Sequence, residues 1–140
     1  MRIVNYTRCR YATRPELIPK FIAKYNSGNF DLIIGNRLHD ISSMPIHRRA
    51  SNFLTSFLIS LKTGVKIKDS QSGFRLFDVK HLQALLPKFS GFEAESEILI
   101  KAARNNLKIG FVNIPTIYNS NESKMKSLDA IIGFIKVLFI

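Results

Sequence analysis

The stretch KDSQSGFRLFDVKHLQALLP (residues 68–87) carries a polar loop, a strand and a helix start in one continuous run. Residues 74–77 are a short apolar run that contains a single arginine, which is typical of a strand. Asp78 follows directly and stands where an N-cap residue would open the next helix. A loop, a strand and a helix that follow one another this closely indicate an α/β protein.

The same alternation extends to both ends of the chain. We predict strands over residues 30–35, 65–68, 74–77 and 108–118, and helices over residues 14–28, 50–62, 78–87, 93–106 and 127–140. No internal repeat or low-complexity linker divides the sequence. The order of elements therefore predicts a single domain, residues 1–140, in which a mixed β-sheet is flanked by helices.

Local signals indicate where these helices begin and end. Thr13 and Glu16 are spaced like a capping box, and Gly28 and Gly64 stand where two helices would stop. Pro19 lies inside the first helical pattern, so that helix either bends there or starts later than the pattern suggests.

Two helices carry pronounced apolar patterns. In residues 50–62 the apolar side chains recur at helical spacing: Phe53, Leu54, Phe57, Leu58 and Leu61. The terminal helix, with Ser127 as its cap, is apolar almost all the way round, which suits burial or membrane contact better than exposure. It could lie on a membrane, lead into spans, or cover the sheet.

The chain is strongly basic, with a formal net charge of +11 and 46% hydrophobic residues. Residues 1–68 carry 12 Lys/Arg against 3 Asp/Glu, whereas residues 69–140 carry 9 against 7. A basic half indicates an anionic partner, which could be nucleic acid, acidic lipid or a phosphorylated small molecule. The single cysteine, Cys9, excludes an internal disulfide, and no signal peptide opens the sequence. We therefore expect a cytoplasmic protein, which could act at the cytoplasmic face of the membrane.

The polar loop has two interpretations, a connection between strands or a binding site. Its residues are turn formers, which favours the first. Its chemistry also suits a ligand, because Gly73 allows close backbone approach, Ser70 and Ser72 offer hydroxyl groups, and Arg75 has a planar fork that fits phosphate. Asp69 could serve there as a base or as an orienting carboxylate.

Five motifs stand in a particular order: DLIIGNR, MPIHRRASN, DSQSGFRLF, GFEAESEILIKAARNNLKIGFVNIPTIY and ESKMK. Together they resemble glycosyltransferase family 2, in particular the branch of dolichyl-phosphate mannosyltransferases and bacterial polyprenyl-phosphate glycosyltransferases. The resemblance covers the chain from Pro15 onward. It implies a partial GT-A fold whose N-terminal nucleotide-binding half is largely missing. The implied reaction moves a sugar from a nucleotide-sugar donor to a polyprenyl phosphate or another acceptor.

The resemblance also implies roles for individual residues. Arg75 would contact the acceptor phosphate and Asp69 would line the same site, which makes these two the candidate catalytic residues. Arg37 and one of Arg48 and Arg49 would face donor or acceptor phosphates. Further candidate substrate-binding residues are Ser70, Gln71, Ser72, Gly73, Glu93, Glu95 and Lys124. Glu93 and Glu95, together with Glu97, could instead have a structural role at a helix N-terminus. Lys124 could instead be an ordinary solvated lysine.

The family's metal motif is absent. Intact members hold Mg²⁺ or Mn²⁺ with an Asp-x-Asp motif, whose positions fall here on Arg8 and Arg10. Arginine cannot bind a divalent cation. Residues 8–13 can be encoded by a sequence that reads Asp-Ala-Asp when one base is dropped, so we interpret residues 1–14 as aberrant. We expect no metal bound by this chain and no sugar transfer by it alone. The histidines, His39, His47 and His81, lack ligand spacing and are expected to be ordinary surface or cap residues.

Two other classes of function remain open from the sequence. A basic nucleic-acid-binding module would explain the charge, but no aromatic-basic sheet signature or Cys/His finger is present, so we expect no nucleic-acid partner. A non-catalytic remnant would expose part of its sheet, and it could then form oligomers or aggregates.

Overall fold

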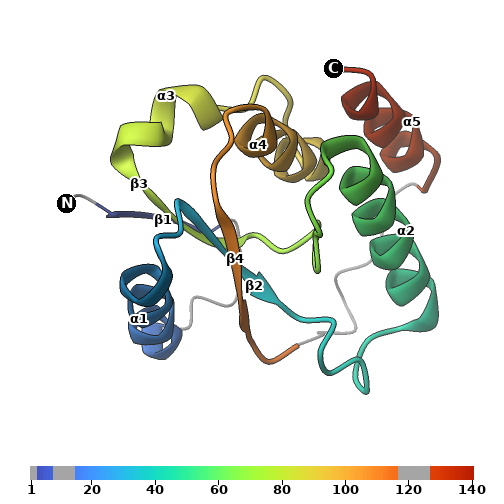
Figure 1. The fold of residues 1–140 in the computed structure, drawn as a ribbon. Helices are drawn as coiled ribbons and strands as arrows, with labels where there is room; N and C mark the ends of the chain where they lie inside the picture. Colours follow the sequence, from blue (N-terminus) through green and yellow to red (C-terminus); the bar gives the residue numbers. More distant parts are fainter. Residues whose placement is uncertain (1–2, 8–14, 117–126) are drawn as a thin grey trace.

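The computed structural model describes residues 3–7, 15–116 and 127–140 (Figure 1). The strands are β1 (Ile3–Thr7), β2 (Leu32–Asn36), β3 (Phe74–Asp78) and β4 (Ile109–Asn113). The α-helices are α1 (Ile18–Gly28), α2 (Ile46–Thr63), α3 (Leu82–Leu85), α4 (Phe92–Arg104) and α5 (Ser127–Leu138). Short 3₁₀ helices, η1 (Pro15–Leu17) and η2 (Val79–His81), precede α1 and α3.

The strands form one mixed sheet in the order β1-β3-β2-β4. β3 is antiparallel to both β1 and β2, and β2 is parallel to β4 with Leu32 opposite Ile109. The predicted mixed sheet is therefore confirmed, as are its strands near residues 30–35, 74–77 and 108–118.

The strand predicted over residues 65–68 is wrong, because this segment is a loop. Ile67 is buried in it, and the Ile67 N–H donates to Ser60 Oγ of α2 at 2.9 Å. A side-chain acceptor thus satisfies a backbone group that would otherwise need a strand partner.

Helices cover both faces of the sheet (Figure 1). α1 lies on one face, and α2, α4 and α5 lie on the other. Side chains alternate along the strands, and they divide between two buried clusters. The α1 face holds Leu17, Phe21, Ile33, Phe74, Leu76 and Ile114. On the other face the strand residues Leu32, Ile34 and Phe77 pack with apolar residues of α2, α4 and α5.

The helix ends agree with most of the local signals. α1 begins at Ile18 with Pro19 in its first turn, so the later start is the correct alternative and no interior hydrogen bond is lost. The left-handed residue after α1 is Asn29 (φ 52°), one position beyond the predicted stop at Gly28. Gly64 (φ 70°) ends α2 as predicted, and α5 begins at Ser127. Thr13 lies outside the described residues.

The two left-handed caps predict opposite responses to substitution. Gly64→Ala should lower the free energy of unfolding by about 1 kcal/mol, because a Cβ is unfavourable at positive φ. Asn29→Gly should leave stability unchanged or raise it slightly, because glycine removes that same penalty at α1. Urea unfolding of both variants checks this. A Gly64→Ala variant as stable as the parent would contradict the assigned cap geometry.

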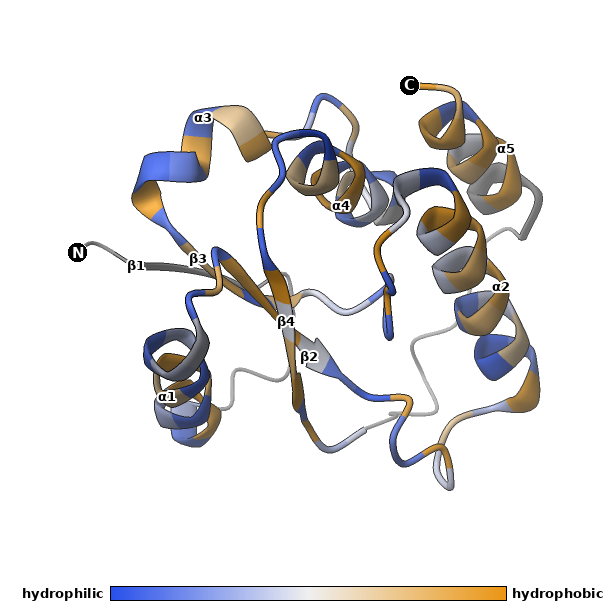
Figure 2. Cartoon of the chain, viewed as in Figure 1, coloured by the Kyte–Doolittle hydropathy of each residue, from blue (hydrophilic) through white to orange (hydrophobic). Residues whose placement is uncertain are grey.

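α2 faces the sheet with its polar side. Its buried residues are Asn52, Ser56 and Ile59, whereas four of the five apolar residues noted in the sequence point outward and the fifth, Leu58, is half-buried. Phe53, Leu54, Phe57 and Leu61 are 54%, 58%, 59% and 65% exposed. Figure 2 shows hydrophobic residues along both α2 and α5. In the described part of the chain, no helix has both the length and the apolar character needed to cross a membrane.

Candidate functional site

The candidate site lies where the carboxyl ends of the parallel strands β2 and β4 meet the start of β3. In open α/β sheets this edge is the usual place for ligands. Asn36 at the end of β2 donates from Nδ2 to Asn113 Oδ1 of β4 at 3.1 Å. Thr116 Oγ1 donates to the Arg37 carbonyl at 2.9 Å. These contacts fix the chain that leaves β2 against the chain that leaves β4.

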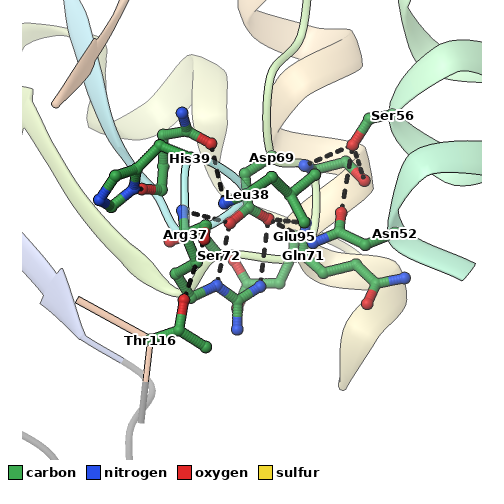
Figure 3. Close-up of polar contacts among 12 residues, drawn as sticks. Arg37, Leu38, His39, Asn52, Ser56, Asp69, Gln71, Ser72, Glu95 and Thr116 are labelled. Carbon is green, nitrogen blue, oxygen red and sulfur yellow. Dashed lines mark hydrogen bonds and ion pairs between the residues drawn. The ribbon is translucent and has the colours of Figure 1, made fainter. Parts of the chain in front are cut away.

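Asp69 is the centre of the site, and Figure 3 shows it between Arg37 and α2. Its side chain is fully buried. Oδ2 accepts hydrogen bonds from Arg37 N (3.0 Å) and Arg37 Nε (2.9 Å), and Oδ1 accepts one from Arg37 Nη2 (3.1 Å). Oδ1 also accepts from Asn52 Nδ2 at 2.8 Å and from the Gln71 N–H at 3.2 Å. The carboxylate therefore joins β2, α2 and the polar loop.

These partners determine the ionisation of Asp69. Burial alone raises the pKa of a carboxyl, but the hydrogen bonds and charge of Arg37, with the hydrogen bond from Asn52, outweigh burial and hold the pKa of Asp69 below its ordinary value. A carboxylate with a low pKa and this many donors is a weak general base. The geometry instead suits the second alternative from the sequence, a carboxylate that orients Arg37.

Arg75 and Glu95 lie together in the interior. Arg75 is fully buried, and its guanidinium donates to the carbonyls of Ser72 (2.9 Å), Ser70 (3.1 Å) and Glu95 (2.8 Å). Its Nη2 also lies 3.4 Å from the buried Glu95 carboxylate. Alternation along β3 explains this, because Arg75 shares the α4-facing side of the strand with Phe77. A contact from Arg75 to phosphate remains a prediction.

The other polar residues of the loop form most of their hydrogen bonds with other residues of the protein. Ser70 Oγ lies 2.9 Å from Thr55 Oγ1 and accepts from Ser56 Oγ at 3.1 Å. Gln71 Nε2 donates to Thr55 Oγ1 at 3.2 Å. The buried Ser72 hydroxyl has no hydrogen-bond partner among the described residues. Gly73 is not among the glycines with positive φ. The polar residues of this loop are thus turned mainly toward α2 and shape the loop.

The two neighbouring arginines of α2 differ. Arg49 Nε donates to the Met44 carbonyl at 2.7 Å. Arg48 is half-buried, and its guanidinium makes no hydrogen bond or ion pair within the part of the chain that is described. It lies one turn before Asn52, and therefore on the helix face that reaches Asp69. The structure thereby favours Arg48 over Arg49 as the arginine available to a ligand.

The acidic residues of α4 contact other parts of the chain. A Cβ on Gly133 of α5 would overlap Glu93 Oε1, so the Glu93 carboxylate lies against α5. Glu97 accepts from the N–H groups of Lys88 (2.7 Å) and Phe89 (2.9 Å) and pairs with Lys101. Burial raises the pKa of Glu97, but these partners bring it below its ordinary value. The substrate-binding roles of Glu93 and Glu95 stay predictions.

Several expectations concern residues outside the described ranges: Lys124, Arg8, Arg10 and Cys9. Within those ranges, no three His, Cys, Asp or Glu side chains gather in a way that could hold a metal ion. Both oxygens of Asp69 already accept hydrogen bonds, and the Arg37 guanidinium lies beside them, so Asp69 does not fit a divalent metal.

The histidines agree with the ordinary roles expected for them, since His39 and His47 are exposed and His81 pairs with Asp31 at 3.1 Å.

Sequence reasoning did not assign four residues that build the site: Asn36, Asn52, Ser56 and Thr116. Asn52 and Ser56 had a usable signal, because they are spaced four residues apart and follow Arg48 at the same interval.

A separate groove of about 340 Å³ lies at the opposite end of β2, near Asp31, and it contains no residue of this site.

The chain is similar to proteins about twice its length. It is 32% identical over 130 residues to an uncharacterized protein of Methanocaldococcus jannaschii, covering 89% of this chain and 53% of that protein. It is 33% identical over 125 residues to the UDP-N-acetylglucosamine–dolichyl-phosphate N-acetylglucosaminyltransferase of Methanococcus voltae, covering 86% of this chain and 49% of that enzyme. No family model matches. The chain thus spans about half the length of the curated relatives it matches.

A solved structure shares the fold. The crystal structure of glucosyl-3-phosphoglycerate synthase from Mycobacterium tuberculosis in complex with uridine diphosphate matches with a TM-score of 0.68 at 18% identity. The match covers 99% of this chain and 50% of that one. At this identity the likeness shows a shared fold, which is the partial GT-A fold that the sequence predicts.

Proposed function

The chain belongs to the family 2-type glycosyltransferases, of which it spans about half, and on this premise we propose that it forms the acceptor-binding part of an enzyme that glycosylates a polyprenyl phosphate. The name of the Methanococcus voltae relative, which includes dolichyl phosphate and a UDP-sugar, supports this choice of acceptor and donor. The reaction would take place at the cytoplasmic face of a membrane. The acceptor oxygen would attack the anomeric carbon while the bond to the nucleoside diphosphate breaks.

The observation that carries the proposal is the fixed position of Arg37. Its side chain is 24% exposed, and the buried Asp69 carboxylate holds it through Nε and Nη2. Asn52 in turn fixes Asp69. A cation held in this way loses little conformational entropy when it binds an anion, so it is well suited to receive a phosphate.

Arg48 adds a second positive charge from the first turn of α2. Positive charge also accumulates there from the N-terminal end of the helix dipole. In this proposal Arg37 and Arg48 contact the phosphate, and Asp69 and Arg75 position the residues that do. The described residues do not fit a divalent cation, and no step of the proposal involves one.

Binding of farnesyl phosphate, a short polyprenyl phosphate, tests the function. We expect Arg48→Ala to weaken binding about tenfold or more, because one charge-assisted hydrogen bond to phosphate is lost. Isothermal titration calorimetry provides the dissociation constants. Lys20→Ala is the matched control, because it removes the same charge from an exposed position on α1. Equal weakening by both substitutions would mean that only overall charge attracts the ligand, and the proposed site would be wrong.

A further inference from the structure

The backbone ladder between β2 and β4 ends just before Arg37. The Ile114 N–H donates to the Asn36 carbonyl at 3.0 Å, and no backbone hydrogen bond joins the described residues beyond this point, 37–40 and 115–116. The Leu38 N–H turns back instead and donates to Asn36 Oδ1 at 3.1 Å. The segment that carries Arg37 therefore needs side chains to hold it against the chain that leaves β4.

The hydroxyl group of Thr116 makes the next contact between the two segments. Thr116 Oγ1 donates to the Arg37 carbonyl at 2.9 Å and to the Asp40 carbonyl at 3.2 Å. A hydroxyl group has one proton, so Thr116 shares it between the two carbonyls. Figure 3 shows the hydroxyl group directed toward Arg37. Because the Asp40 N–H also donates to the Arg37 carbonyl, at 3.4 Å, Thr116 holds both ends of the turn formed by residues 37–40.

A second contact runs in the opposite direction. Ser43 Oγ donates to the Thr116 carbonyl at 3.2 Å. The segment between β2 and α2 thus contacts Thr116 through the threonine side chain and through its backbone. Thr116 itself is half-buried, whereas Asp40 and Ser43 are exposed. The position of the exposed turn therefore depends on the chain that leaves β4.

These contacts restrain Arg37 from two sides. The Arg37 N–H donates to Asp69 Oδ2 at 3.0 Å, and the Arg37 carbonyl accepts from Thr116. Each peptide group is a rigid plane, so a hydrogen bond on either side of the arginine Cα fixes where the side chain begins. Asp69 then fixes where it ends, through Nε and Nη2. Without Thr116, only Asp69 would determine the direction of the guanidinium.

We propose that Thr116 is a positioning residue, whose hydroxyl group holds the Arg37 backbone so that the guanidinium faces the acceptor phosphate. This inference rests on the proposed function, in which Arg37 contacts that phosphate. Thr116 itself does not touch the ligand. Coupling between two sites is reciprocal, so phosphate binding at Arg37 also stabilises the chain that leaves β4.

Nuclear magnetic resonance of the ligand-free protein tests the contact. Thr116→Val keeps the shape of the side chain but removes the hydroxyl group. We expect the Arg37 Nε–H to exchange with water about fivefold faster, because one hydrogen bond that restrains this residue is lost. Thr116→Ser restores the hydroxyl group and should exchange like the parent. Thr63→Val is the matched control, because Thr63 Oγ1 also donates to a backbone carbonyl, that of Ile59 at 2.8 Å, but within α2.

Farnesyl phosphate binding then tests the role in the site. Thr116→Val should bind about fivefold more weakly in isothermal titration calorimetry, whereas Thr116→Ser and Thr63→Val should bind like the parent. Both valine variants should lose similar stability in urea, because each loses one hydrogen bond to a carbonyl. A purely structural role of the Thr116 hydroxyl group would affect stability but not affinity.

Three results would overturn the inference: unchanged Arg37 exchange in Thr116→Val, equally fast exchange in Thr63→Val, or faster exchange with unchanged affinity. If Arg48→Ala weakens binding and Thr116→Val does not, the phosphate site is correct and only the role of Thr116 is wrong. The exchange measurement needs no ligand. It therefore tests the Thr116–Arg37 contact even if Arg48→Ala shows that the proposed function is wrong.

Discussion

Asp69→Asn is expected to lower the free energy of unfolding by about 3 kcal/mol at neutral pH. The substitution keeps the shape of the side chain but removes its charge, so Arg37 loses its ion pair. The new amide also places an N–H₂ group where donors of Arg37, Asn52 and Gln71 now converge. Removing one member of a buried charged pair has costs of about this size, because its partners are left unsatisfied. Urea unfolding measures the difference.

The effect should depend on pH in one direction. In the unfolded chain the pKa of an aspartate is about 3.9. In the folded chain Arg37 and Asn52 hold the pKa of Asp69 below its ordinary value despite burial. The stabilisation by Asp69 is therefore fully present above the unfolded pKa, and it is lost as the pH falls through the folded pKa. The difference between parent and Asp69→Asn should be largest at neutral pH and should shrink under acidic conditions.

Asp40→Asn is the control, because Asp40 is exposed and its carboxylate accepts hydrogen bonds from the N–H and hydroxyl of Ser42 in the same turn. This variant should unfold at nearly the same urea concentration as the parent. If Asp69→Asn also unfolds at the parental midpoint, the Arg37–Asp69–Asn52 contacts do not stabilise the fold, and the preorganisation of Arg37 loses its basis.

Arg75→Met is expected to cost about 4 kcal/mol, which is typical when one partner of a buried ion pair is removed. Three carbonyl groups and the Glu95 carboxylate would lose a donor in the interior. Two of those carbonyls belong to the loop that carries Asp69, so the loop should also become more mobile. Urea unfolding gives the stability, and hydrogen exchange at Ser70 and Ser72 gives the local opening.

A double-mutant cycle separates this role from a simple loss of packing. Arg75→Met/Glu95→Met should be more stable than Arg75→Met alone, because the second substitution removes the charge that was left buried. Lys20→Met removes an exposed cation and should leave both measurements unchanged. Additive costs for the two buried substitutions would contradict a direct Arg75–Glu95 interaction and would reopen a role for Arg75 outside the protein interior.

The sequence predicted which part of the chain forms the candidate site, but it did not predict how the residues of the site contact one another. The sequence placed Asp69, Arg75 and Arg37 in it, and the structure brings Asp69 and Arg37 together. It places Arg75 behind the loop, because side chains on β3 alternate and Arg75 falls on the inner side. Asn52 was not assigned because its role depends on which face of α2 meets the loop. The aberrant reading of residues 1–14 stays a prediction, as does oligomer formation.

The sequence by itself determined most elements of this protein and their general arrangement, although it did not predict β1 and wrongly predicted a strand over residues 65–68. Apolar periodicity, Gly64 and Asp78 indicated where strands and helices run, and the alternation of elements indicated a mixed sheet flanked by helices. These features follow from local interactions along the chain, which are readable from neighbouring residues. The order of motifs likewise indicated the family.

Only the tertiary structure decided which side of each element faces inward. The spacing of Phe53, Leu54, Phe57 and Leu61 shows that they share one helix face, but it does not say what that face meets. The buried Asp69 needs Asn52 as a donor, and this requirement turns the apolar side of α2 outward. The free energy of satisfying a buried charge depends on partners distant in sequence, and periodicity contains no information about them.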